Sequence, residues 1–287
     1  MKGINGFLLV DKPVGITSFD VIRSLRRITG VKKIGHTGTL DPFASGLLVC
    51  AVGSFTRLCT LVEAEDKSYI AEVKLGEKTD TGDTEGKVIE CSSAFPDAIS
   101  ESELSAQVLG LSELAIPKYS AVKVKGKPAY EYARSGVELE LSARAVRITE
   151  FSIISYAKPF LTYSCRVSKG TYIRSLSEYI ALQLGTVGYT TELRRISIGS
   201  VRVNAASALV DLNPENYQSR FAPVKAVLAG YPQKSLSDDI IRSLLNGQNP
   251  PDTGLDTDRI IVLDEDGNIC SVAERKAGLL YPLINLS

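Results

Sequence analysis

The stretch AVRITEFSIISYAKPFLTYSCRVSKGTYIRSLSEYIALQLG, residues 145–185, decides the fold class of this chain. Residues 145–156 and 161–170 have the pattern of two paired strands, and residues 171–185 have that of an amphipathic helix ending at Gly185. Adjacent strand pairs are typical of antiparallel sheets, whereas a doubly wound sheet alternates single strands with helices. The stretch therefore favours an α+β fold with a largely antiparallel sheet.

The segments on either side extend this pattern. Residues 68–76 alternate as a half-buried strand, and Tyr69 lies on its apolar face. Further elements are predicted as strands at 6–10 and 192–201 and a helix over 19–30. Thr17 or Ser18 can cap that helix, and Gly30 ends it. Because strands and helices interleave irregularly, we predict a mixed, mainly antiparallel sheet flanked by helices.

The pattern changes past about residue 230. A capped helix, a hairpin around Asp266-Gly267 and a last strand are predicted there, at residues 237–248, 259–276 and 279–286. The Pro-containing stretch within 212–231 is the natural boundary. We therefore predict a large domain at 1–230 and a small β-rich module at 231–287.

Composition narrows the class of protein. The chain has 287 residues, 44% of them hydrophobic, so it can bury a sizeable core. No run approaches the ~18 apolar residues of a membrane span, and the N-terminal apolar stretch is too short for a signal peptide. The five cysteines form no CxxC pair and there is one histidine, which favours buried free thiols and no zinc site. We expect a cytoplasmic protein without a metal.

The charges are balanced in number but not in position. The net charge is zero, yet residues 1–35 carry +5, residues 144–202 carry +6 and residues 63–115 carry −9. A basic face would suit a polyanion such as RNA. The same charges could equally be scattered over unrelated faces of the folded chain.

The sharpest local feature is GHTGTLDP at residues 35–42, within a Gly- and Pro-rich segment that we predict to be a structured loop. It holds Asp41 close to His36, the one histidine of the chain. Taken alone, an aspartate before a proline also fits an ordinary turn. The chain has no phosphate-binding GxxxxGK[ST], no GxGxxG after a strand and no G-x-S-x-G elbow, so those classes of site are not supported.

Five ordered motifs give the chain a family resemblance. In sequence order they are DKPVGITSFDVIRSLRR at 11–27, GHTGTLDPFASGLLVCAVGSFTRL at 35–58, DKSYIAEVKLGEKTDTGDTEG at 66–86, IPKYSAVKVKGKPAYEYARSG at 116–136, and SKGTYIRSLSEYIALQLG with TELRRISIGSV within 168–201. Together they resemble the bacterial tRNA pseudouridine-55 synthases, the TruB family, over about residues 6–202. This resemblance implies a pseudouridine-synthase-like catalytic domain followed by a small PUA-like module.

The resemblance also implies roles for individual residues. Asp41 would be the catalytic aspartate, Tyr69 the aromatic that stacks on the target base, and Arg174 the cation that pairs with Asp41. From the residues alone, Tyr69 could instead be a core residue and Arg174 a solvated cation. The implied substrate-binding residues are His36 for extracting the nucleotide, Tyr172 and Leu193 for the pocket wall, Lys12 and Pro13 for its floor, and Lys123 and Lys125 for gripping RNA.

The implied reaction is the isomerisation of uridine to pseudouridine at position 55 in the tRNA T-loop. The N1–C1′ bond breaks, the base turns and a C5–C1′ bond forms, so the reaction is redox-neutral and we expect no cofactor. The stacked base must first be flipped out of its loop. An insertion at about 116–143, in which lysines and tyrosines interleave, has the composition of an RNA-gripping segment, although a solvated charged segment has it too.

Three alternatives stay open. An RNA-guided pseudouridine synthase carries a similar aspartate motif, a tRNA-folding chaperone would bind the T-arm without chemistry, and a nucleoside hydrolase would release free uracil. The expected partner is tRNA, through its T-arm and T-loop. We expect no membrane and no obligate protein partner, and a monomer.

Overall fold

A computed structural model describes residues 4–120, 122–124, 126–137, 139 and 141–286, so the predicted RNA-gripping residue Lys125 lies outside the described part. The chain folds into two compact units. Unit 1 holds the residues up to 41 together with 46–65 and those from 197 onward, and unit 2 holds 42–45 and 66–196. The predicted division at residue 230 remains a prediction.

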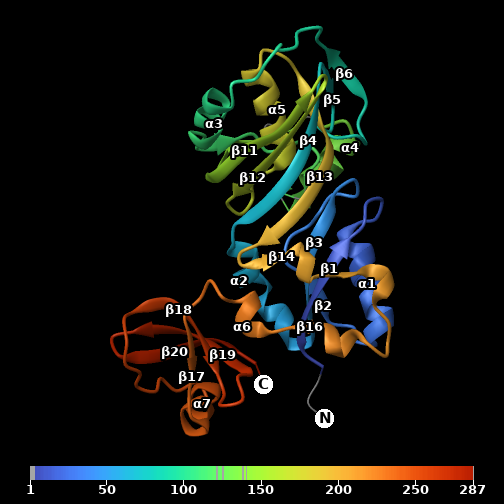
Figure 1. Cartoon of the computed structure of the whole chain (residues 1–287). Coiled ribbons are helices and arrows are strands. Elements are labelled where there is room, and N and C mark those ends of the chain that lie inside the picture. The colour runs from blue at the N-terminus through green and yellow to red at the C-terminus, as the bar shows by residue number, and fades with distance from the viewer. Residues whose placement is uncertain (1–3, 121, 125, 138, 140, 287) are drawn as a thin grey trace. The chain divides into compact units, whose positions relative to one another are not determined.

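Unit 1 is built around the first strand of the chain, which is labelled β1 in Figure 1. The side chains of this strand are buried on both faces. Strand β1 (Gly6–Lys12) runs antiparallel to β3 (Ser45–Val52), which also pairs with the short β2 (Ile34–His36). Alternate residues of β1 belong to two different hydrophobic core clusters, because successive side chains of a strand point to opposite faces. Leu8 and Val10 lie in one cluster, and Phe7 and Leu9 in the other.

Helix α1 (Ser18–Thr29) covers the first of these faces. Its apolar side chains Val21, Ile22 and Leu25 share a cluster with the β1 residues Leu8 and Val10. The helix begins at a complete capping box: the Thr17 hydroxyl accepts a hydrogen bond from the Asp20 amide, and the Asp20 carboxylate accepts one from the Thr17 amide. It ends at Gly30, which has a φ of 70°. Glycine adopts this left-handed conformation easily because it has no Cβ. The predicted start and stop are confirmed.

The last part of unit 1 has its own sheet. Strands β17 (Gln233–Ser235), β18 (Thr257–Leu263), β19 (Ile269–Lys276) and β20 (Leu279–Asn285) lie in that order, with the first pair parallel and the others antiparallel. Helix α7 (Asp238–Leu245) packs against β19 and β20. This sheet is compatible with a PUA-like module, and the predicted hairpin is the β18–β19 turn, where Gly267 has a φ of 82°.

The last part of unit 1 is also joined to its beginning. The Tyr231 hydroxyl donates to the Leu61 carbonyl in helix α2 (Cys59–Ala64) over 2.9 Å. Val272 of β19 lies in the same apolar cluster as Phe7 of β1. The small sheet therefore shares a core with the strands that begin the chain.

Unit 2 contains the stretch that decides the fold class. Strand β11 (Ile148–Ala157) runs antiparallel to β12 (Phe160–Val167), and β12 runs antiparallel to β4 (Lys67–Leu75), with β13 (Gly188–Ile198) beyond β4. Helix α5 (Ile173–Gln183) follows β12, as predicted, and the Tyr163 and Ser177 hydroxyls are 2.9 Å apart where it packs on the sheet. The predicted α+β fold with a mixed, mainly antiparallel sheet is confirmed.

Shorter elements complete both units. Those of unit 2 are β5 (Glu77–Thr79), β6 (Val88–Cys91), α3 (Glu101–Leu109), β7 (Glu113–Leu114), β8 (Lys123–Val124), β9 (Lys127–Pro128), α4 (Ala129–Arg134) and β10 (Arg144–Ala145). Those of unit 1 are β14 (Val201–Arg202), β15 (Ser207–Ala208), β16 (Phe221–Ala222), α6 (Val224–Val227) and four 3₁₀ turns, at Gly53–Leu58, Val203–Ala205, Leu209–Asp211 and Tyr217–Arg220. The described part contains no helix long and apolar enough to cross a membrane.

Two expectations need correction. The segment predicted as a loop from residue 35 begins as strand β2, because its backbone pairs with β3 through Gly35 and His36. The thiols are free, but not all are buried, since Cys91 is exposed at the end of β6. Cys165 is buried within the β4–β12 pair, and burial raises the pKa of its thiol to about 12.

We predict that Gly188→Ala destabilises unit 2. A Cβ at this position would lie 2.8 Å from the Ala181 Cβ on α5 and 2.9 Å from the Val73 Cγ1 on β4, closer than atoms in contact can be. Overpacking of this kind costs about 1–3 kcal/mol. Urea unfolding measures the loss. Gly35→Ala is the control, because its Cβ would meet only atoms at 3.7 Å; an equal effect in both variants would contradict the prediction.

Candidate active site

The Asp41 loop is fixed to the start of α1. The Ser18 hydroxyl accepts a hydrogen bond from the Leu40 amide over 2.9 Å and donates to the Leu40 carbonyl over 3.1 Å. Both residues are buried. Earlier in the loop, the Thr37 amide donates to the Val49 carbonyl on β3 over 3.0 Å. The backbone that carries Asp41 is therefore held from both α1 and β3.

Lys12, at the end of β1, is a buried cation. Its side chain is fully shielded from solvent, and its ammonium donates to the carbonyls of Pro13 over 2.9 Å and Ile16 over 2.7 Å. The loop that leads to α1 thus wraps around a charge, because a buried ammonium needs acceptors. Pro13 itself is exposed. His36 lies on β2 opposite Cys50 of β3. Unit 1 therefore holds four of the predicted site residues, which are Lys12, Pro13, His36 and Asp41.

Unit 2 holds the other predicted residues, which are Tyr69, Tyr172, Arg174, Leu193 and the two lysines of the insertion. Tyr69 lies on the buried face of β4, opposite Cys165, and is 8% exposed. Leu193 is buried on β13. Tyr172 is the residue before α5, where its carbonyl accepts the Leu176 amide, and it is partly exposed. Tyr69 therefore has the apolar surroundings that both a core residue and a pocket residue would have.

Arg174, in the first turn of α5, is buried and held by several partners. Its Nη1 lies 3.2 Å from Asp83 Oδ2, and both side chains are about 5% exposed or less. The same nitrogen donates to the Thr81 carbonyl over 2.7 Å, and Nη2 donates to the Tyr119 carbonyl over 2.9 Å. The reading of Arg174 as a solvated surface cation is wrong, because its guanidinium is enclosed.

Asp83 is a residue of this site that the sequence analysis did not single out. Its Oδ1 accepts from the Thr81 hydroxyl over 2.6 Å and from the Glu85 amide over 3.0 Å, while Oδ2 faces Arg174. Its carboxylate is thus saturated by neutral donors and one cation. The signal was present in TDTGD, where a second acidic residue follows a turn, and a buried arginine requires such a partner.

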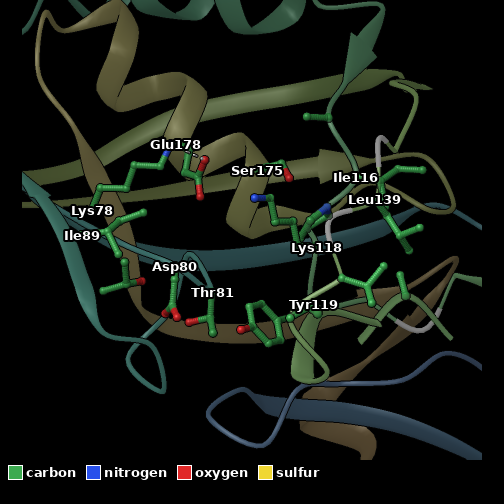
Figure 2. Close-up of a pocket in the computed structure, with 17 residues that line it drawn as sticks. Lys78, Asp80, Thr81, Ile89, Ile116, Lys118, Tyr119, Leu139, Ser175 and Glu178 are labelled. Carbon is green, nitrogen blue, oxygen red and sulfur yellow. Dashed lines mark ion pairs between the residues drawn. The ribbon is translucent and has the colours of Figure 1, made fainter. Parts of the chain in front are cut away.

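A pocket of about 470 Å³ lies in unit 2 beside this network (Figure 2). Residues from β5 and the following turn, from the insertion and from α5 line it, among them Thr81 and Tyr119, whose carbonyls hold Arg174. At one end of its lining, Lys78 Nζ forms an ion pair with Glu178 Oε2 over 3.4 Å (Figure 2). Of the described residues that line this pocket, none is a predicted site residue. The pocket lies between residues of the insertion and the residues that surround Arg174.

The predicted RNA-gripping segment contains a small hairpin. Lys123 and Lys127 are exposed on β8 and β9, whose residues pair around Gly126, and Lys125 lies outside the described residues. Tyr119 is partly exposed. Among the described residues, no group of three or more His, Cys, Asp or Glu side chains is placed to hold a metal ion.

Known proteins match the chain along almost all of its length. The family model described as TruB family pseudouridylate synthase, N-terminal domain, matches residues 26–173. The chain is 37% identical to tRNA pseudouridine synthase B of Burkholderia pseudomallei (strain 668), covering 98% of this chain and 96% of the relative. It is 39% identical to tRNA pseudouridine synthase B of Clostridium kluyveri, over 85% of this chain and 84% of the relative.

A solved structure supports the fold. The chain is similar to a crystal structure of the archaeal box H/ACA sRNP Nop10-Cbf5 complex, with a TM-score of 0.69 and 20% identity, over 98% of this chain and 85% of that one. At this identity the likeness bears on the fold alone. It agrees with the predicted mixed sheet flanked by helices and with a PUA-like sheet at the end of the chain.

We predict that Asp83→Asn strongly destabilises the protein. The change keeps the shape of the side chain but removes the carboxylate charge that faces the buried Arg174 guanidinium, and breaking a buried ion pair costs about 3–5 kcal/mol. Urea unfolding measures it. Asp97→Asn is the control, because the Asp97–Lys158 pair at 2.6 Å is fully exposed on the aspartate side and its loss should leave the unfolding midpoint unchanged. Equal midpoints for both variants would refute the prediction.

Proposed function

The chain belongs to the TruB family of pseudouridylate synthases, and on that premise we propose that it modifies uridine 55 in the T-loop of tRNA with Asp41 as its catalytic residue. It is an enzyme, an isomerase that converts uridine to pseudouridine in tRNA. The observation that carries this conclusion is the match to relatives named tRNA pseudouridine synthase B over nearly the whole chain.

Asp41 fits the chemical requirement of the reaction. Breaking the N1–C1′ bond needs a nucleophile or a base beside the sugar or the base ring, and a carboxylate can serve as a covalent catalyst. An ordinary aspartate has a pKa near ~3.9 and is anionic at neutral pH. The anchored backbone of Leu40 supports this role, because a reacting group must be held in a fixed geometry.

Tyr69, Arg174, Tyr172 and Leu193 are proposed to surround the flipped base. An aromatic ring and apolar walls replace the stacking that the nucleotide loses on leaving its loop, a loss of a few kcal/mol. Arg174 is proposed to keep Asp41 anionic, and its enclosure by Asp83 and two carbonyls supports a fixed orientation for its guanidinium. His36, Lys12 and Pro13 keep the positioning roles that the resemblance implies.

The insertion is proposed to grip the RNA from one side of the target. Lys123 and Lys127 are exposed on its hairpin and free to reach phosphates, and single-stranded loops are bound by phosphate contacts together with aromatic stacking. A monomer in the cytoplasm, without an obligate protein partner, is part of the same proposal. The small module at the end of the chain is net negative and receives no RNA-binding role here.

One assay tests the function and its alternatives. The purified protein is incubated with an unmodified tRNA transcript and no other RNA, and modified positions are mapped. We expect pseudouridine at position 55 alone. A requirement for a guide RNA would favour the RNA-guided alternative, release of free uracil would indicate a hydrolase, and tRNA refolding without modification would indicate a chaperone.

The first functional prediction concerns Asp41→Asn. The change removes the charge but keeps the size and turn-forming ability of the residue, so single-turnover pseudouridine formation should fall by at least about 10³-fold while tRNA affinity and melting temperature stay near wild type. Asp211→Asn, an exposed aspartate of the same unit, is the control and should keep full activity. Substantial turnover in Asp41→Asn would remove Asp41 from the mechanism.

The second concerns the Tyr69 hydroxyl. If it moves a proton during catalysis, as we expect, Tyr69→Phe should lower the single-turnover rate by about 10²–10⁴-fold with little change in melting temperature. Tyr163 lies on the neighbouring strand β12, and its buried hydroxyl is hydrogen-bonded to Ser177 of helix α5, so Tyr163→Phe should change melting temperature and not rate. A near-wild-type rate in Tyr69→Phe combined with a loss of one to two decades in Tyr69→Leu would mean stacking alone.

A further inference from the structure

Helix α1 presents a strongly basic surface that the proposed mechanism does not use. Between Asp20 and Asp41 the chain has five basic residues and no acidic one, although its overall net charge is zero. All five are exposed, and together they define the α1 basic face: Arg23, Arg26, Arg27, Lys32 and Lys33. The three arginines lie on α1 itself, and the two lysines follow shortly after its last turn.

The helical spacing places the arginines together. Positions 23, 26 and 27 are three and four residues apart, so their side chains are neighbours on the helix surface. The opposite side of α1 is buried through Val21, Ile22 and Leu25. The basic side therefore faces solvent along a helix of 12 residues, about 18 Å long.

An exposed aromatic ring lies among these cations. Phe19 is 54% exposed, and the guanidinium carbons of Arg23 and Arg26 lie 5.6 Å and 5.7 Å from its ring centroid. Cation–π contacts at exposed sites are worth only about 0.5–1 kcal/mol, so they orient the arginines without neutralising them. Arginine planes beside an open aromatic ring are the groups that bind phosphates and stack on unpaired bases.

The charges of this face are largely unpaired within the described part of the chain. Arg23 forms a surface ion pair with Asp20 at 3.1 Å, and the other four cations have no ion pair there. Neighbouring like charges on a helix oppose folding by a few tenths of a kcal/mol per pair. The interaction of Arg26 and Arg27 with the helix C-terminus offsets part of this repulsion, so a stabilising role must be separated from binding by experiment.

The helix that carries the α1 basic face begins beside the loop that carries Asp41. Ser18, the first residue of α1, is hydrogen-bonded through its hydroxyl to both the amide and the carbonyl of Leu40, next to Asp41. A nucleic acid whose target nucleotide reaches Asp41 therefore has the rest of its chain within reach of α1, since the helix begins at that loop and extends about 18 Å.

We infer that the α1 basic face binds the phosphate backbone of the tRNA substrate outside the target nucleotide, an inference that rests on the proposed function. Backbone contacts supply affinity and register and carry no sequence information. An anionic membrane is a poorer partner, because the apolar side chains of α1 that would enter a bilayer are buried in the core of unit 1.

The test is the salt dependence of tRNA binding. Arg26→Gln/Arg27→Gln is compared with Lys87→Gln/Lys158→Gln, which removes two exposed cations from unit 2, and all proteins carry Asp41→Asn so that no turnover occurs. Dissociation constants for an unmodified tRNA transcript are measured between about 50 and 200 mM salt. Each phosphate contact contributes about 0.7–0.9 to the slope of log K against log salt, so the α1 variant should lose roughly 1.5 and the control close to nothing.

Two further variants exclude a purely structural explanation. Arg26→Lys/Arg27→Lys keeps both charges and should keep most of the slope, and Phe19→Ser should weaken binding about ten-fold or more without changing the slope. Melting temperatures are recorded for all variants. An unchanged slope in Arg26→Gln/Arg27→Gln, or a slope loss equal to that of the control, overturns the inference. Failure of the wild-type enzyme to form pseudouridine would instead overturn the proposed function, because the slope is measured without turnover.

Discussion

The buried ion pair of Arg174 and Asp83 is the constraint on which unit 2 depends. Two charges can leave water only if nearly every donor and acceptor around them is satisfied. Here the Asp83 carboxylate accepts from Thr81 and Glu85, and Arg174 donates to the carbonyls of Thr81 and Tyr119. One pair of charges thereby joins helix α5, the turn after β5 and the start of the insertion, which are far apart in sequence. The pocket beside Arg174 takes its lining from the same three segments.

Unit 1 also encloses a buried charge among hydrogen-bonding groups. The Lys12 ammonium is enclosed by backbone carbonyls of the following loop, and the Ser18 hydroxyl makes two hydrogen bonds to Leu40. These contacts fix the entry to α1 and the backbone before Asp41. The same helix carries an apolar side into the core and a basic side into solvent. Stability and the proposed RNA contacts therefore use different faces of one element, and the phosphate-binding groups can change without loss of packing.

The division of labour among charges follows from burial. Arg174 is enclosed and serves orientation, since its donors are committed to fixed acceptors. Arg26 and Arg27 are exposed and keep their hydration until a polyanion replaces it, which makes their contribution sensitive to salt. A charge count along the sequence treats all of these residues alike, although their environments give them opposite physical roles.

The sequence by itself determined the fold class and the limits of α1 and α5, which follow from local information: the strand pairs at 145–170 and the capping residues Thr17 and Gly30. Asp41 was singled out by the resemblance of five ordered motifs to a family, because its Gly- and Pro-rich segment alone also fits an ordinary turn. Only the tertiary structure decided that Arg174 is enclosed, that Asp83 is its partner and that the cations of α1 share one open face. Burial and ion pairing depend on which segments meet in space, and residues 83 and 174 are brought together by packing that no local pattern encodes.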